Sequence, residues 1–208
     1  MGVARDERRL LCDLFHEVGP DVPTLCGGWT ARDLAAHLVV RERRPDAAGG
    51  ILIKPLAARL ARIQNSVAAK PWPELVDLVR GGPPWWFPTS IGPVDELVNV
   101  AEFFVHHEDV RRGTPGWQPR PADPKRDAAV WSAARRTARM MFRNSPVGVV
   151  LRRNDGEEIV AKRGPNTAAV VGEPGELLLF SFGRNEVRVE FDGEQASIGV
   201  VRGLSRGL

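Results

Sequence analysis

The chain has 208 residues, of which 43% are hydrophobic, and its 29 basic and 26 acidic side chains leave a net charge of +3. This length fits one large domain or two small ones with a buried core. The arginines are scattered among acidic residues and form no basic stripe with interleaved aromatic side chains, so the composition argues against nucleic-acid binding. We find no signal-peptide pattern, no apolar run of about eighteen residues and no CxxC spacing of the cysteines, and we therefore expect a cytoplasmic protein that does not enter a membrane.

Six segments in the first part of the chain show the hydrophobic periodicity of amphipathic helices. They span residues 3–18, 30–44, 56–67, 73–79, 95–112 and 127–142. Thr30 followed by Asp33 is a capping-box pattern, with Asp in the place of the usual Glu, and it predicts a clean helix start at residue 30. Residues 1–143 are therefore predicted to form an all-helical bundle with four long helices.

Two segments between these helices are predicted to be irregular. Residues 81–93, GGPPWWFPTSIGP, are too rich in proline and glycine to be helical, and residues 113–124 form a proline-rich crossing. The aromatic cluster of Trp85, Trp86 and Phe87 either covers a core or lines the mouth of a pocket. The tendency of aromatic side chains to be buried favours the first interpretation.

After residue 146 the pattern changes from helical periodicity to alternation. Strands are predicted over residues 147–151, 159–161, 187–191 and 196–201, with a turn at 154–156 and a short helix over 173–183. We therefore predict a small α+β domain over residues 147–208, and an α+β fold class for the whole chain. This second domain contains no His, no Cys and no glycine-rich phosphate loop, so it offers no visible chemistry.

Glu102, His106 and Asp109 lie on one line of the helix predicted over residues 95–112. At 100° per residue, His106 lies about 40° around the axis from Glu102, and Asp109 lies about 20° to the other side. An apolar stripe runs beside this line, so the three side chains should project together at the rim of a buried face. The stripe consists of Val94, Val98, Ala101 and Val105. His107 lies about 140° from Glu102 and cannot join the group.

His37 lies in the middle of the helix predicted over residues 30–44, on a face that must be buried. A lone buried histidine is usually a hydrogen-bonded core residue, but His37 is the only other histidine on an apolar helix face. His37, Glu102 and His106 would form a His₂Glu ligand set between facing helices, with one metal coordination position left open, as a catalytic site requires. Asp109 is the candidate catalytic residue, either as the acceptor for a ligand histidine N–H or as a base next to the metal.

Three segments resemble a known family: GWTARDLAAHL, EFFVHHEDVRR and GEPGELLLFSFGR. Together they are similar to the mycothiol-dependent maleylpyruvate isomerases of the DinB-like superfamily of metal-binding four-helix bundles. The resemblance covers nearly the whole chain and implies a DinB-like bundle followed by a small α+β domain. It also implies a divalent metal, typically zinc, held by His37, Glu102 and His106, with Asp109 matching the family's trailing Asp. Several members add or transfer low-molecular-weight thiols, whereas the segment GGPPWWFPTS has no clear counterpart.

A chemical function follows from such a site. A thiol with a pKa of about 8.5 is mostly protonated and unreactive at neutral pH. A metal with an open position would bind it as the thiolate and align it with an electrophile. Addition to a conjugated double bond, rotation and elimination would make an isomerase, whereas release of the adduct would make a transferase, with Asp109 or a metal-bound water taking the proton. We therefore expect a metal-dependent enzyme that acts on a small-molecule thiol, such as mycothiol, and an electrophilic substrate.

Two other classes of function stay open. One is a non-catalytic bundle that binds a metal or a small molecule. In the other the metal is irrelevant, Glu102 and His106 form only an internal salt bridge, and the C-terminal domain binds a lipid or a partner. Cys26 could approach the metal, although a free cysteine is more often a small buried hydrophobe. Arg41, Arg111 and Arg112 could hold a substrate carboxylate, although internal ion pairs with acids such as Glu42 and Glu108 are the simpler role. The sequence does not indicate the substrate or the oligomeric state.

Overall fold

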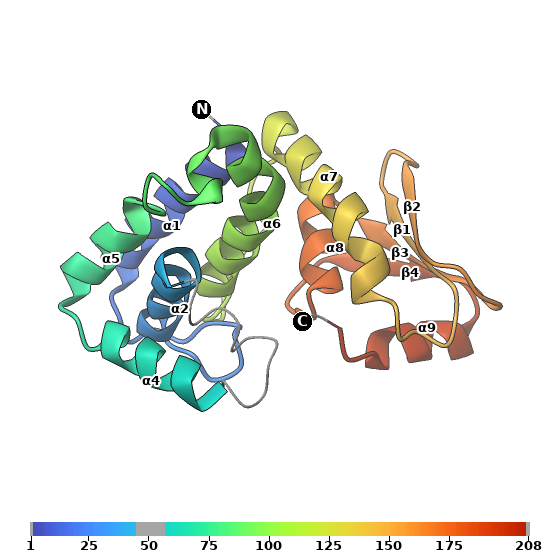
Figure 1. Ribbon diagram of the computed structural model, residues 1–208. Coiled ribbons are helices and arrows are strands. Elements are labelled where there is room, and N and C mark those ends of the chain that lie inside the picture. The colour runs from blue at the N-terminus through green and yellow to red at the C-terminus, as the bar shows by residue number, and fades with distance from the viewer. Residues whose placement is uncertain (1, 45–56, 207–208) are drawn as a thin grey trace. The chain divides into compact units, whose positions relative to one another are not determined.

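The computed structural model describes residues 2–44 and 57–206 (Figure 1). Within these residues the chain forms eight α-helices, one 3₁₀ turn and a four-stranded mixed sheet, which confirms the α+β class at this coarse level. The chain divides into two compact units, Met1–Gln118 and Pro119–Leu208.

The described part of the first unit is helical. Its elements are α1 (Val3–Val18), α2 (Ala31–Arg43), α4 (Ala57–Ala68), α5 (Trp72–Arg80), η3 (Pro88–Ser90) and α6 (Gly92–Arg111). α1 packs along α6 and α5, while α2 packs against α4 and α5 (Figure 1). The helices predicted for this stretch are confirmed, except that the start predicted for α4 at residue 56 lies outside the described residues.

Large apolar side chains from three helices form the core of the first unit. Phe15 of α1, Leu34 and Leu38 of α2, and Phe103 of α6 are fully buried. Burial of a side chain of this size stabilises the fold by about 1.5–3 kcal/mol. The core therefore fixes α2 and α6 against each other, and these are the two helices that carry the predicted metal ligands.

The aromatic cluster ahead of α6 does not cover a core. Trp85 is 88% exposed and Trp86 is 56% exposed, whereas Phe87 is partly buried, so the interpretation favoured from the sequence is wrong for both tryptophans. Of residues 81–93, predicted to be irregular, Gly92 and Pro93 belong to the first turn of α6 and Pro88–Ser90 form η3, while the rest is irregular, as the proline and glycine content predicts. Proline is tolerated in the first turn of a helix, where Pro93 stands, whereas Pro83 and Pro84 keep the start of the segment out of a helix. The two tryptophans face solvent.

The second unit is a four-stranded sheet with three described helices. Its elements are α7 (Pro124–Met141), β1 (Val149–Arg153), β2 (Glu158–Lys162), β3 (Ala168–Gly172), α8 (Pro174–Ser181), β4 (Val189–Asp192) and α9 (Gln195–Gly203). The strand order is β2-β1-β3-β4, with β1 antiparallel to β2 and parallel to β3, and β3 antiparallel to β4. α7 packs against α8 and β2, and both α8 and α9 contact β3.

Two elements of this unit differ from the sequence prediction. Residues 196–201, predicted as a strand, belong to α9, so this part of the prediction is wrong. The buried residues Ser197, Ile198 and Val201 follow helical spacing, and packing of α9 on β3 overrides the β-branched composition. β3 is not predicted because four of its five residues are buried, which removes the alternation that identifies a strand with one exposed face.

α7 belongs to the second unit, whereas the sequence pattern assigned residues 127–142 to a bundle over residues 1–143. The division falls between Gln118 and Pro119, inside the proline-rich segment. α7 carries the buried side chains of Val130, Trp131 and Ala138, and it contacts α8 and β2. The DinB-like four-helix bundle therefore stays a prediction.

Candidate metal centre

α2 presents His37 at the edge of the core. The helix begins at the predicted capping box, in which the Thr30 hydroxyl accepts a hydrogen bond from the Asp33 backbone N–H and the Asp33 carboxylate accepts one from the Thr30 N–H. The leucines on either side of His37 in the helix are fully buried, whereas 20% of the His37 side chain is exposed. The His37 ring packs on Trp29, with ring centroids 5.2 Å apart. The capped helix and the indole together position the imidazole.

α6 brings Glu102 and His106 to the same place. The Glu102 Oε1 atom lies 3.5 Å from His37 Nε2 and 3.3 Å from His106 Nε2. The ligand atoms of the three residues all lie within 4.8 Å of one another, and the two histidine rings meet edge to face with centroids 5.6 Å apart. The structure thus brings together the three side chains that the sequence pattern singles out.

These separations fit a tetrahedral metal site. Bonds of about 2.0–2.2 Å from zinc to nitrogen and oxygen ligands place the ligand atoms of a regular tetrahedron about 3.3–3.6 Å apart. The two measured separations of 3.3 and 3.5 Å fall in this range. Because the three side chains are between 12% and 21% exposed, a small molecule from solution can reach the group. The residues could therefore hold a divalent ion and leave a position for a further ligand.

The second ring nitrogen of His106 faces two other groups. His106 Nδ1 lies 2.9 Å from Asp109 Oδ2 and 3.6 Å from Cys26 Sγ. Asp109 is fully buried, and its Oδ2 atom also accepts a hydrogen bond from the Cys26 thiol at 2.9 Å. Of the two roles predicted for Asp109, this arrangement suits the acceptor that fixes the tautomer of His106. A fully buried carboxylate that is engaged by two donors is less suited to take a proton from a substrate.

Cys26, His106 and Asp109 form a second group of possible metal ligands, also within 4.8 Å of one another. Both groups use His106, but through different ring nitrogens. The Leu25 backbone N–H donates to the Asp109 carbonyl at 3.1 Å and holds the loop against α6. After Cys26, Gly27 and Gly28 turn the chain away from α6 with φ angles of +31° and +84°. This glycine pair is the one feature of the sequence that indicates a sharp turn at Cys26.

The charges of Glu102 and His106 support each other. Burial alone would raise the pKa of Glu102, but the His106 charge, hydrogen bonds from His106 and His37, and Arg41 bring that pKa well below its usual value. Burial alone would lower the pKa of His106, but Glu102 and hydrogen bonds with Asp109 and Cys26 raise it well above its usual value. In the metal-free protein a proton therefore competes with a metal for His106.

Arg41 connects the group to the interior of the first unit. Its Nε atom lies 3.2 Å from Glu102 Oε1, and its Nη1 atom donates to Asn99 Oδ1 at 2.7 Å. Asn99 in turn donates to Asp95 Oδ1 at 2.7 Å, and both of these residues are buried. An internal ion pair of Arg41 is thus confirmed, but its acid is Glu102 and not Glu42, which pairs with Arg8. Arg111 and Arg112 pair with Glu108, as predicted. Asn99 and Asp95 were not predicted from the sequence. They stand three residues before Glu102 and four residues before Asn99, so the helical spacing that links Glu102 to His106 also leads to them.

Other residues near this line lie outside the group. His107 is buried on another side of α6, where its Nδ1 atom lies 2.9 Å from Glu7 Oε2, as its predicted angle requires. The predicted apolar stripe is buried only in part, because Val105 is buried but Val98 is 44% exposed. Phe103, which lies outside that stripe, contributes the fully buried aromatic ring of α6.

In residues 2–44 and 57–206, no helix combines the length and the apolar character needed to cross a membrane. No protein-family model, curated protein or solved structure matches the chain. What points to a function is the group of His37, Glu102 and His106 that α2 and α6 bring together.

Proposed function

We propose that this protein is a divalent-metal-dependent thiol transferase or isomerase that activates a low-molecular-weight thiol at His37, Glu102 and His106. The observation that carries the proposal is the convergence of one carboxylate oxygen and two ring nitrogens, from two helices, at separations of 3.3 and 3.5 Å. The resemblance of three sequence segments to the mycothiol-dependent maleylpyruvate isomerases supports zinc as the metal and mycothiol as the thiol.

Each ligand is oriented by a neighbour. Arg41 holds the Glu102 carboxylate, and Trp29 packs against His37. Asp109 accepts a hydrogen bond from Nδ1–H of His106, so Nε2, the ring nitrogen next to Glu102, is the one that would bind the metal once its proton has left. A ligand set that is oriented before the metal arrives loses less side-chain freedom when it binds.

The charge of the ligand set favours an anionic fourth ligand. A bound divalent ion would lower the pKa of a thiol ligand and hold it as the nucleophilic thiolate. Two neutral imidazoles and one carboxylate leave such a site with an excess positive charge, to which Arg41 adds at 3.2 Å from Glu102. A thiolate matches this excess, whereas a neutral thiol does not.

Zinc titration of the metal-free 208-residue chain tests the first part of the proposal. His106→Ala and Glu102→Gln should each weaken zinc binding by more than about 100-fold, since even the supporting partners of metal ligands contribute about 10–100-fold. His16→Ala is the matched control, because His16 is an exposed histidine of α1 outside the group. Unchanged affinity in His106→Ala would refute the proposed site.

Turnover tests the second part. The zinc-loaded chain would be given mycothiol, or another low-molecular-weight thiol, together with an electrophile such as maleylpyruvate, while adduct formation and cis–trans isomerisation are followed. Activity that disappears in His37→Ala supports the enzyme. Zinc binding through the three ligands without turnover of any thiol in the panel would favour the alternative, a non-catalytic metal-binding protein.

A further inference from the structure

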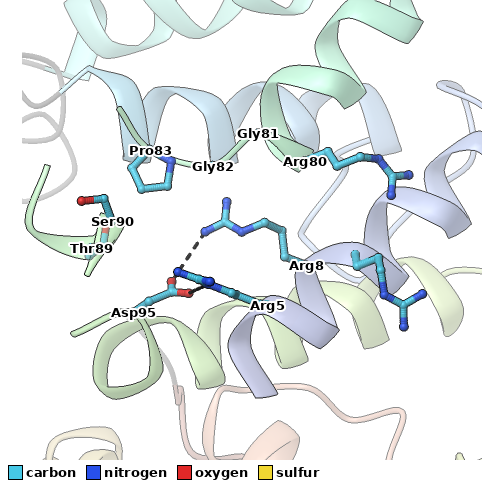
Figure 2. A pocket seen from close by; sticks show the side chains of 10 residues that line it. Arg5, Arg8, Arg80, Gly81, Gly82, Pro83, Thr89, Ser90 and Asp95 are labelled. Carbon is cyan, nitrogen blue, oxygen red and sulfur yellow. Dashed lines mark ion pairs between the residues drawn. The ribbon is translucent and has the colours of Figure 1, made fainter. Parts of the chain in front are cut away.

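A cavity of about 260 Å³ lies in the first unit, between α1, the segment after α5, η3 and the first turn of α6. Four arginines, the hydroxyl residues Thr89 and Ser90, a Gly-Gly-Pro segment and Asp95 line it. Figure 2 shows Arg8 reaching between that segment and Asp95, with Arg5 beside the same carboxylate. Among the described lining residues only Pro83 has an apolar side chain, so the cavity suits a polar ligand.

The buried charges of this cavity compensate one another. Arg8 is only 6% exposed, donates two hydrogen bonds to Glu42 and lies 3.6 Å from Asp95. Asp95 also accepts a hydrogen bond from Asn99 and lies 3.9 Å from Arg5. The one carboxylate in the lining is therefore already matched by cations, and it offers little repulsion to a further anion.

The outer arginines keep their charge available. The Arg5 side chain is 56% exposed, and its 3.9 Å contact with Asp95 is long for an ion pair. Arg9 and Arg80 share a single carboxylate, Asp13, which is 50% exposed. Exposed ion pairs of this kind contribute little to stability, so an incoming anion can replace them at low cost. With Glu42 and Asp13 counted beside Asp95, four guanidinium groups face three carboxylates, which leaves one excess positive charge around the cavity.

Thr89 adds a hydrogen-bonding group that the protein does not use. Its Oγ1 atom is buried and has no hydrogen-bond partner within the part of the chain that the structure describes. The neighbouring Ser90 hydroxyl, by contrast, donates to the Trp85 carbonyl at 2.7 Å. A buried hydroxyl without a partner is costly, and this cost disappears when a ligand accepts its hydrogen.

We propose that this cavity is a binding site for a small oxyanion, the phosphate or carboxylate group of a polar ligand. The arginines supply charge-assisted hydrogen bonds, and Thr89 donates a further one. The site is separate from the candidate metal centre, because Asp95 lies seven residues before Glu102 on α6, about 10 Å along the helix axis. It requires no metal, so its failure and the failure of the proposed thiol chemistry can be told apart.

Calorimetric titration of the metal-free chain with inorganic phosphate, and in a second arm with malonate, tests this site. We expect saturable binding of at least one of these ions to one site per chain. Arg5→Gln should weaken it about tenfold, which is the effect of losing one charge-assisted hydrogen bond. Thr89→Val keeps the shape of the side chain and removes the orphan hydroxyl. It should weaken binding several-fold while the midpoint of thermal unfolding stays unchanged or rises.

Arg62→Gln is the matched control, since it removes the same charge from an exposed position of α4. It should bind both ions as the wild type does. Tighter binding of phosphate identifies a phosphate-bearing ligand, and tighter binding of malonate identifies a carboxylate. The proposal is overturned if neither ion binds, or if Arg62→Gln loses as much affinity as Arg5→Gln, because binding then follows net charge alone.

Discussion

Replacing Asp109 by Asn examines whether His106 is held ready as a metal ligand. Asp109 is fully buried, and its Oδ2 atom lies 2.9 Å from His106 Nδ1. Asparagine has the same shape and keeps one acceptor oxygen, but it carries no charge, and its amide group can present either a donor or an acceptor to the ring. The substitution therefore leaves the packing intact and weakens the interaction that fixes the tautomer of His106 and raises its basicity as a ligand.

We expect Asp109→Asn to weaken zinc binding by about 10–100-fold, or about 1.4–2.7 kcal/mol, which is the usual effect of removing a group that orients a metal ligand. We place Asp109→Asn toward the upper end of this range. The carboxylate is 0% exposed, so bulk solvent does not reach it to supply another acceptor. Unfolding should change less, because the amide still fills the space of the carboxylate.

Competition of the metal-free chain with a zinc-binding dye measures this affinity for the wild type and for Asp109→Asn. Cys26→Ala is the matched control, because it removes the other donor to Asp109 and leaves the contact between Asp109 and His106 in place. It should bind zinc as the wild type does. Wild-type affinity in Asp109→Asn would refute the reasoning. A larger loss in Cys26→Ala would assign the metal to the group of Cys26, His106 and Asp109 instead.

Arg8→Met should lower the free energy of unfolding by about 3–5 kcal/mol, because it leaves Glu42 buried without its cation, and adding Glu42→Leu should recover part of this loss in chemical denaturation. A double variant less stable than Arg8→Met would contradict this account. Burial raises the pKa of the Cys12 thiol to about 12, so at about pH 8 iodoacetamide should modify Cys26 and spare Cys12 in the native metal-free chain, as counted by mass spectrometry. Zinc affinity should increase with pH across neutrality, because the pKa of His106 is raised well above its ordinary 6.5 and its proton must leave before a metal binds. The same shift stabilises the metal-free fold fully below about pH 6.5, and that contribution is lost as the pH rises through the pKa of His106 in the folded chain. A flat affinity between about pH 6 and about pH 8 would rule out His106 as a ligand.

The parts of the site that could be predicted are those set by a single helix. The angle between Glu102 and His106 follows from the helical repeat, and the start of α2 follows from the capping box at Thr30, which is a local hydrogen-bond pattern. Placing His37 opposite them needs only that α2 and α6 share a core. The buried Phe103 and the leucines that flank His37 supply that core.

The parts that could not be predicted depend on contacts between distant segments. Cys26 reaches His106 because a backbone hydrogen bond ties its loop to Asp109, and no periodicity in the sequence encodes that bond. α9 is a helix because its buried residues fit β3, although its composition favours a strand. α7 packs in the second unit because its apolar face fits α8 and β2. An amphipathic pattern predicts that a helix has a buried face, but not which elements pack against that face.

α6 carries a polar stripe in the place where a packed helix usually carries apolar residues. Its members are Asp95, Asn99, Glu102, His106 and Asp109, at spacings of four, three, four and three residues. Buried polar groups are tolerated only when they are paired, and the partners come from neighbouring helices: Arg8 of α1, and Arg41 of α2. A shift of α2 along α6 by one helical turn, about 5.4 Å, would break the contacts of Arg41 and His37 with Glu102. The contacts that satisfy the stripe therefore also set the separation of the proposed ligands. Of its five members, Glu102 and His106 alone are partly exposed, and a ligand from solution can meet the stripe at that place.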